Sequence, residues 1–171
     1  MQRIKLCFQS HRFRFWTLLS LTFAFLLIEA IPKSAAYAHK GPAAPKILKE
    51  PAIRDAIVSG AERYLNVPYR FGGATPKGFD CSGLVLYLYK QQGFSVPRSV
   101  REMRPTLKLT HLPKKGDIIF FLNDNGNVGH VGIYINEEKF IHSPREGLKI
   151  RYEKLKHPYW KKRFVEYRSI L

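Results

Sequence analysis

The residue of this chain best placed to do covalent chemistry is Cys81. Asp80 is a good N-cap for a helix that we expect to run from Cys81 to about Gln92. The unpaired amide N–H groups and the positive dipole end of a helix start stabilise a thiolate, the form of cysteine that attacks carbonyl carbons. We therefore predict that Cys81 is a nucleophile with a lowered pKa. The alternative is a cysteine that only fills the core as a small hydrophobic side chain.

A cysteine nucleophile needs a base, and two histidines are candidates. His130 and His142 each lie in an apolar segment that is typical of a strand. Antiparallel pairing with a three-residue loop centred on Glu137 would place both imidazoles on one face, a diagonal step apart. A two-residue loop at Glu137 and Glu138 would put them on opposite faces. The catalytic hypothesis therefore predicts the odd loop or a compensating bulge.

The same three side chains could instead hold a structural zinc ion, since thiolate and imidazole are both zinc ligands. Structural zinc sites have four ligands, however, and the sequence has no Cys-x-x-Cys pair. The remaining histidines of the expected exported chain, His39, His111 and His157, fall in a linker or beside prolines in loops, where we expect them at the surface. We therefore predict neither a metal nor an organic cofactor.

Helical patterns come first along the chain and strand patterns follow. Apolar side chains recur at helical spacing between residues 51 and 65 and again between 81 and 92. Strand patterns lie at residues 118–121, 130–135, 139–143, 148–152 and 164–170. This order indicates an α+β domain in which N-terminal helices pack on a mainly antiparallel sheet.

The first 38 residues are typical of a secretory signal. They combine a basic start, an apolar run from Phe15 to Ile28 and a small-residue cleavage site at Ala36-Tyr37-Ala38. Residues 39–50 contain Gly, Pro and Lys and are predicted to be a linker, so the folded domain should span residues 51–171. Cleavage would remove Cys7 and export a chain with a single cysteine. The alternative is a signal that stays uncleaved as a membrane anchor.

The chain is strongly basic. Its formal net charge is +16, and removal of the first 38 residues, with five basic and one acidic side chain, would leave +12. Such a charge attracts anionic surfaces, which for an exported protein are those of the cell envelope. The basic residues are scattered apart from Lys161-Lys162-Arg163, and no nucleic-acid-binding motif is present, so nucleic acid is a poor candidate partner.

Several short motifs occur along the expected domain in a fixed order. They are Tyr69-Arg70-Phe71-Gly72-Gly73, Phe79-Asp80-Cys81-Ser82-Gly83-Leu84-Val85, Val96-Pro97-Arg98-Ser99, Gly116-Asp117-Ile118-Ile119-Phe120-Phe121, Gly129-His130-Val131-Gly132-Ile133-Tyr134 and Phe140-Ile141-His142-Ser143. This series resembles the motifs of the NlpC-type cell-wall cysteine peptidases, and the resemblance runs from about residue 51 to the C-terminus. It implies a papain-like fold. The ending from Tyr159 to Phe164 is similar to Gram-negative members, which implies the periplasm, although secretion is also possible.

The resemblance implies a role for each matched residue. Cys81 would be the nucleophile, His130 the general base and His142 the group that orients His130. Four side chains would contact the substrate: Tyr69, Asp80, Ser82 and Arg98. Asp80 could bind an amine of the substrate in addition to capping the helix, and the sequence does not separate these two roles. Met103 departs from the pattern, because similar proteins often carry Gln near this position.

The implied reaction is hydrolysis of peptidoglycan stem peptides through a thioester. Similar proteins cut either the D-alanyl-diaminopimelate cross-link or the D-glutamyl-diaminopimelate bond, so the sequence leaves the scissile bond open. Two other functions fit the same residues: a thiol-dependent amidase or acyltransferase, and an inactive basic module that only binds the wall. Direct membrane contact is expected only if the signal stays uncleaved.

Overall fold

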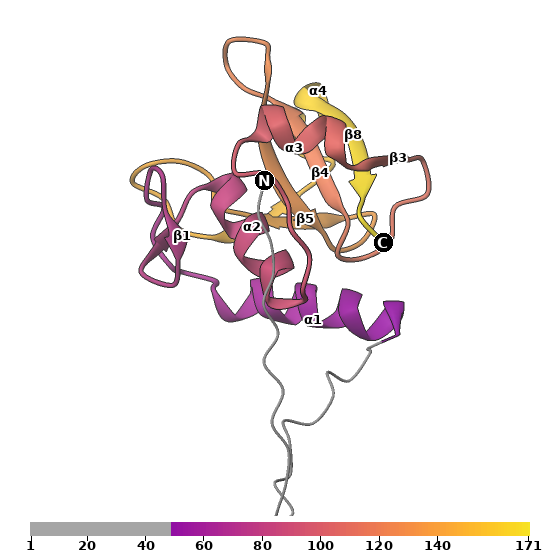
Figure 1. The fold of residues 1–171 in the computed structure, drawn as a ribbon. Coiled ribbons are helices and arrows are strands. Elements are labelled where there is room, and N and C mark those ends of the chain that lie inside the picture. Colours follow the sequence, from indigo (N-terminus) through magenta and orange to yellow (C-terminus); the bar gives the residue numbers. More distant parts are fainter. Residues whose placement is uncertain (1–48) are drawn as a thin grey trace, which may run out of the picture. The chain divides into compact units, whose positions relative to one another are not determined.

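A computed structural model describes residues 49–171, which form helices and antiparallel strands (Figure 1). In chain order the elements are α1 (Glu50–Arg63), β1 (Ala74–Thr75), β2 (Gly78–Phe79), α2 (Cys81–Gln91), α3 (Val100–Thr106), β3 (Lys108–Thr110), β4 (Ile118–Leu122), β5 (Val128–Tyr134), β6 (Lys139–His142), β7 (Arg151–Lys154), α4 (Pro158–Arg163) and β8 (Phe164–Ser169). The predicted signal, most of the predicted linker and Cys7 lie outside the described residues.

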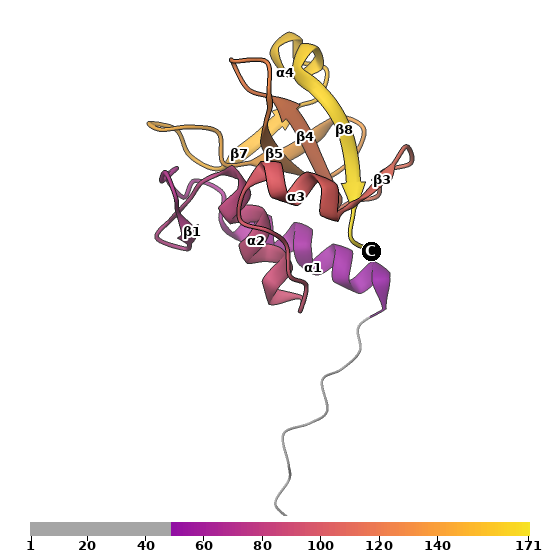
Figure 2. The same cartoon turned by 45° about the horizontal axis from the view of Figure 1, so that its top comes forward.

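The first three helices pack on one side of the main sheet. It has six strands in the order β3-β8-β4-β5-β6-β7, and each neighbouring pair is antiparallel. Figures 1 and 2 both show α2 and α3 in front of β4 and β5. The main core joins the first three helices to the sheet and includes Ile57, Leu84, Leu88, Met103, Phe120, Val131 and Ile133. The predicted α+β arrangement is confirmed.

Strand β4 is apolar at successive positions because both of its faces are buried. Ile118 and Phe120 belong to the main core. Side chains alternate between the two faces of a strand, so the residues between them point the other way. Ile119 and Phe121 form a second apolar cluster with Phe140 of β6 and Trp160 of α4. This second cluster lies on the face of the sheet opposite the main core.

The pairing of β5 with β6 has the odd register that the catalytic hypothesis requires. Ile133 pairs with Ile141 and Tyr134 with Phe140, so the turn is centred on Glu137. The alternative two-residue loop is excluded. A Cβ atom on Gly132 would lie 2.7 Å from the Phe140 ring and 3.2 Å from the Cβ atom of His142, so a side chain at this position would displace both.

Four features were not predicted from the sequence: α3, α4, β3 and the β1–β2 hairpin. In addition, β7 begins at Arg151, whereas the pattern had indicated a strand from Leu148. Helix α3 did have a signal, because the Ser99 side chain accepts a hydrogen bond from the Glu102 amide at 3.2 Å, and Ser-x-x-Glu spacing is typical of a helix start. The basic residues of this segment obscured its short apolar face, which buries Val100 and Met103.

A buried ion pair ties α1 to the sheet. The guanidinium of Arg54 donates to Asp117 at 2.7 Å and to the Ser169 hydroxyl at 3.2 Å. The Ser169 hydroxyl in turn donates to Asp117 at 2.6 Å. The side chains of Arg54 and Asp117 are only 5% and 2% exposed, so neither charge would be solvated if its partner were removed.

We therefore predict that Asp117→Ala lowers the free energy of unfolding by about 3 kcal/mol, because it removes the buried partner of Arg54 and leaves only the ion pair with the partly exposed Glu50. The matched control is Lys115→Ala, which removes an ion pair with Asp55 in which both side chains are at least half exposed. This control should cost about 1 kcal/mol or less. Urea unfolding of both variants measures the difference, and equal losses would contradict the prediction.

Candidate active site

The start of α2 is built as the sequence predicted. The Asp80 side chain accepts a hydrogen bond from the Gly83 amide at 2.6 Å, so Asp80 is the N-cap and Cys81 is the first residue of the helix. Gly93 follows the helix with a φ of +84°, a conformation that glycine adopts without strain. Cys81 is therefore held at a fixed helix terminus.

Two of the sequence motifs form a single structural unit around this helix start. The Asp80 amide donates to the Gly73 carbonyl at 3.0 Å, and the Gly72 amide donates to the Asp80 carboxylate at 3.1 Å. A Cβ atom on Gly83 would lie 2.0 Å from the Gly73 carbonyl oxygen, so only glycine allows the loop to approach the helix this closely. The loop thereby fixes the backbone on both sides of Cys81.

The structure contradicts the predicted pKa of the thiol. Burial, followed by the negative charge of Asp80, raises the pKa of Cys81 to about 11. Backbone amides, including that of Val131, hydrogen-bond to the sulfur and favour the thiolate, but their effect on the pKa is smaller. Desolvation outweighs the helix start because the sulfur has exchanged water for the packed interface of α2 and β5. At neutral pH the resting residue is a thiol.

The two strand histidines are directly hydrogen-bonded. The Nε2 atom of His130 lies 2.7 Å from the Nδ1 atom of His142. Burial lowers the pKa of His130 to about 4. The pKa of His142 is well below its ordinary value, because the side chain is fully buried and because His130 and Arg151 lie nearby. Both imidazoles are therefore neutral at neutral pH, and one proton is shared between the facing nitrogens.

Trp160 completes this arrangement, and the sequence had indicated no role for it. Its ring stacks on His130 with 5.4 Å between centroids and meets His142 edge-on at 4.8 Å. Phe121 and Phe140 pack against the same indole. This apolar surround accounts for the desolvation of both imidazoles and restricts the planes of their rings. The sequence signal that could have pointed to Trp160 is a bulky aromatic residue on a short helix that starts with Pro158.

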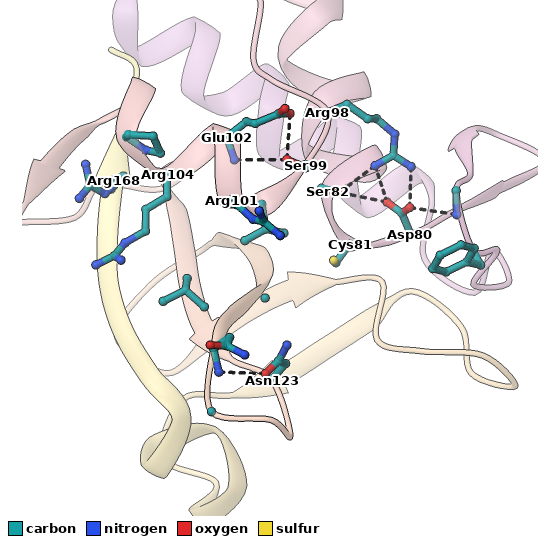
Figure 3. A pocket seen from close by; sticks show the side chains of 18 of the residues that line it. Asp80, Cys81, Ser82, Arg98, Ser99, Arg101, Glu102, Arg104, Asn123 and Arg168 are labelled. Carbon is teal, nitrogen blue, oxygen red and sulfur yellow. Dashed lines mark hydrogen bonds and ion pairs between the residues drawn. The ribbon is translucent and has the colours of Figure 1, made fainter.

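The four predicted substrate-contacting residues gather beside the thiol. Tyr69, Asp80, Ser82 and Arg98 line one pocket together with Cys81 (Figure 3). Burial raises the pKa of Tyr69, followed by repulsion from the nearby Cys81 in its thiolate form and from the Asp80 carboxylate. His130 lines a neighbouring pocket, and Asn123 and Gly129 border both. The thiol and the imidazole therefore line two different hollows that have Asn123 and Gly129 in common.

Arg98 holds the Asp80 side chain from the pocket side. Its guanidinium donates to the two carboxylate oxygens at 3.0 and 2.5 Å and to the Ser82 hydroxyl at 2.8 Å. The dashed lines in Figure 3 trace this network. It explains why Asp80, Ser82 and Arg98 occur together: they form one hydrogen-bonded support beneath the helix start.

A model of the NlpC/P60 family matches residues 66–169 of this chain. The chain belongs to the NlpC/P60 family. The matched residues include the helix start with Cys81, the two hydrogen-bonded histidines and Trp160. Within residues 49–171, no three side chains of His, Cys, Asp or Glu are grouped so that they could hold a metal ion.

Several curated relatives are named for activity on the bacterial wall. The chain is 40% identical to the murein DD-endopeptidase MepH of Escherichia coli K12, over 61% of this chain and 41% of the relative. It is 38% identical to the probable endopeptidase YafL of the same strain, over 70% of this chain and 51% of the relative. The identity to MepS of that strain, a murein DD-endopeptidase and LD-carboxypeptidase, is also 38%, with 70% and 64% coverage. The chain thus spans about half the length of these relatives.

Solved structures support the family fold. An NlpC/P60 family protein from Bacillus cereus superimposes with a TM-score of 0.66 at 31% identity, covering 69% of this chain and 40% of that protein. The NlpC/P60 domain of the peptidoglycan hydrolase SagA gives a TM-score of 0.57 at 27% identity, with 69% of this chain and 98% of that domain covered. The papain-like fold implied by the sequence motifs is confirmed.

The buried imidazoles predict a loss of stability in mild acid. The pKa of His130 falls from 6.5 to about 4 on folding, so between these pH values the unfolded chain binds a proton that the folded chain does not. The free energy of unfolding should therefore decrease as the pH falls through this window, by about 3 kcal/mol for His130 alone. Urea unfolding between pH 7 and 4.5 measures the slope.

Two variants test this prediction. The double substitution His130→Gln with His142→Gln should flatten the dependence of stability on pH. His111→Gln changes an exposed histidine and should leave that dependence unchanged. The pKa values of Glu50 and Glu166 are also lowered from 4.5 on folding, so these carboxylates add to the slope at the acid end of the window, equally in both variants. An unchanged slope in the double variant would rule out the buried neutral pair.

Proposed function

We propose that this protein is a peptidoglycan endopeptidase that cleaves stem peptides with a Cys-His-His triad. The observation that carries the proposal is the 2.7 Å contact between His130 and His142 on strands packed against the helix that begins at Cys81. A nucleophile at a helix start, a base and a third group that orients the base are the parts that covalent hydrolysis of an amide requires. Family membership supports this assignment of roles.

His130 would act as the base through Nδ1. Its Nε2 atom is engaged with His142, so Nδ1 is the nitrogen that remains to accept a proton from the thiol. This requires the tautomer in which His130 donates from Nε2 to His142. His142 then carries its own proton on Nε2, an atom that has no hydrogen-bond partner among the described residues. In this scheme His142 selects the active tautomer of the base.

The reaction would proceed in two stages. The Cys81 sulfur attacks the scissile carbonyl carbon as its proton passes to His130, because the resting residue is a thiol and not a preformed thiolate. His130 then protonates the leaving amine, and a thioester remains on the sulfur. In the second stage His130 takes a proton from water, the hydroxide attacks the thioester, and the thiol is restored. Backbone amides at the start of α2 would stabilise the oxyanion, with Tyr69 beside them.

Peptidoglycan is the proposed substrate because of the names of the relatives and the basic charge of the chain. We also propose that the protein is exported to the periplasm or beyond by its N-terminal signal. Among residues 49–171, none of the helices has the length and apolarity needed to cross a bilayer. The N-terminus of the mature protein shows whether the signal is cleaved or retained. The reaction products show which of the two diaminopimelate bonds is cut.

We expect Cys81→Ala to abolish the release of soluble muropeptides from purified sacculi while the thermal unfolding midpoint stays nearly unchanged. The measurement is mass spectrometry of the digest made by the purified full-length protein, which also identifies the bond that is lost. His142→Ala should strongly reduce turnover, whereas His111→Gln, at an exposed position outside the motifs, should keep it.

Muropeptide release that persists in Cys81→Ala would refute a thiol peptidase. Cys81-dependent loss of a bond to the glycan, or transfer of the acyl group to an added amine in place of water, would indicate the amidase or acyltransferase alternative. Binding to sacculi without any release in the parent protein would indicate a wall-binding module.

A further inference from the structure

We propose that the indole face of Trp160 stabilises the positive charge that His130 acquires during the reaction, which makes Trp160 a positioning residue for the base. The inference rests on the proposed function, because the charge arises when the proton of Cys81 passes to His130. A neutral imidazole that accepts a proton becomes a cation, and here the cation forms where packed side chains have replaced water. Another group must therefore stabilise it.

Within the part of the chain that the structure describes, no carboxylate is hydrogen-bonded to the base. His130 contacts His142, which is itself uncharged in the resting protein. In a Ser-His-Asp triad, by contrast, the third group is an anion that stabilises the imidazolium. On the side of α2 the titratable group is Cys81, whose negative charge passes to the substrate when the sulfur attacks. His142 accepts a hydrogen bond from the base but supplies no negative charge.

The charged side chains around the base do not supply a free anion either. Two acids, two arginines and a histidine line the neighbouring hollow: Asp124, Glu153, Arg145, Arg151 and His157. Asp124 forms an ion pair with Arg163. Glu153 forms an ion pair with Arg151. After burial and the partner imidazole, the positive charge of Arg151 is the next cause that lowers the pKa of His142. The charges on β7 and α4 thus oppose a cation at the base.

Trp160 is the aromatic side chain placed to stabilise this cation. Its ring stacks on His130 at an angle of 29°, with 5.4 Å between centroids. The face of an aromatic ring attracts a cation within about 6 Å of its centroid, most strongly when the ring is that of tryptophan. Phe121 also contacts His130, but its centroid is 6.2 Å away and its ring is tilted by 44°. Of these two rings, the indole is the one within range of the charge.

The packing around Trp160 holds the indole in this position before the charge appears. The side chain is buried, and three aromatic rings meet it edge-on: Phe121, Phe140 and Tyr159. A group that is already oriented toward a developing charge stabilises it without the cost of reorganisation. The attraction between a cation and an aromatic face is also larger in a dry site than at an exposed one. Burial therefore strengthens the contribution expected of the indole.

The first test changes the charge on the indole face and keeps its shape. The chain has two tryptophans, and the other, Trp16, lies in the predicted signal. The full-length protein is produced with mono-, di- or trifluorotryptophan, because ring fluorines draw electron density from the face and hardly change the size of the ring. The readout is alkylation of Cys81 by iodoacetamide, in which the sulfur displaces iodide and its proton passes through His130 to solvent. Mass spectrometry of the peptide that contains Cys81 gives the rate.

We expect the alkylation rate constant at pH 7 to fall with each added fluorine, by about tenfold in total. The pKa of Cys81 is about 11, so near this pH hydroxide removes the proton of the thiol and His130 is no longer needed. The difference between the fluorinated proteins should therefore shrink as the pH rises from 7 to 10.5. A change in packing alone would slow alkylation equally across this range.

A pair of substitutions gives a second measurement. Trp160→Phe keeps a weaker aromatic face and should retain more of the alkylation rate at pH 7 than Trp160→Leu, which keeps only an apolar side chain. The matched control is Phe164→Leu, which removes a ring that contacts Phe121 and Tyr167 and should leave the rate unchanged. Thermal unfolding midpoints show whether each variant is folded in the assay, and the fluorinated series decides the question if Trp160→Leu is not.

Three results would each overturn the proposal: a rate that does not depend on fluorination, equal rates for folded Trp160→Phe and Trp160→Leu, or a deficit that stays constant up to pH 10.5. Failure of the proposed function would be seen separately, as the absence of Cys81-dependent muropeptide release from sacculi, because alkylation requires no peptidoglycan.

Discussion

The hydrogen bond between Nε2 of His130 and Nδ1 of His142 is the interaction on which the proposed chemistry depends. It exists because β5 and β6 pair about a turn centred on Glu137, which brings two residues that are twelve positions apart onto one face of the sheet. A shift of one residue would turn one imidazole to the other face. Gly132 helps to keep the register, since its place opposite β6 leaves no room for a side chain. The geometry of the base is therefore a property of the sheet.

Burial sets the protonation states of the resting site. The same loss of water that raises the pKa of Cys81 lowers the pKa of both imidazoles, so the uncharged thiol and uncharged imidazole are the stable pair. A thiolate and an imidazolium would have to be stabilised by their mutual attraction, by the backbone amides at the sulfur and by bound substrate. In the proposed mechanism, proton transfer is consequently coupled to attack on the carbonyl. Trp160 contributes by keeping the imidazoles dry and by holding their planes at a fixed angle.

Much of the framework could be predicted from local sequence signals. The N-cap at Asp80 and the terminating Gly93 follow from capping chemistry that acts over a few residues. The odd register about Glu137 was expected from the catalytic hypothesis, because the turn residues alone left a two-residue loop open. What could not be predicted depends on contacts between distant segments. The pKa of Cys81 is governed by burial against β5, Trp160 reaches the imidazoles from the far end of the chain, and α3 is stabilised by packing of only two apolar residues. The occupancy of Asp80 by Arg98 likewise joins two motifs whose contact no spacing rule reveals.

The central claim is that His142 holds His130 in the tautomer with its proton on Nε2, which leaves Nδ1 free to accept the proton of the thiol. The most direct measurement is ¹⁵N NMR of the histidine side chains in the full-length protein at pH 7, assigned with His130→Gln and His142→Gln. We predict neutral rings for both residues, with His130 and His142 each protonated on Nε2. A His130 ring protonated on Nδ1 would contradict the account, because a nitrogen that already carries a proton cannot act as the base.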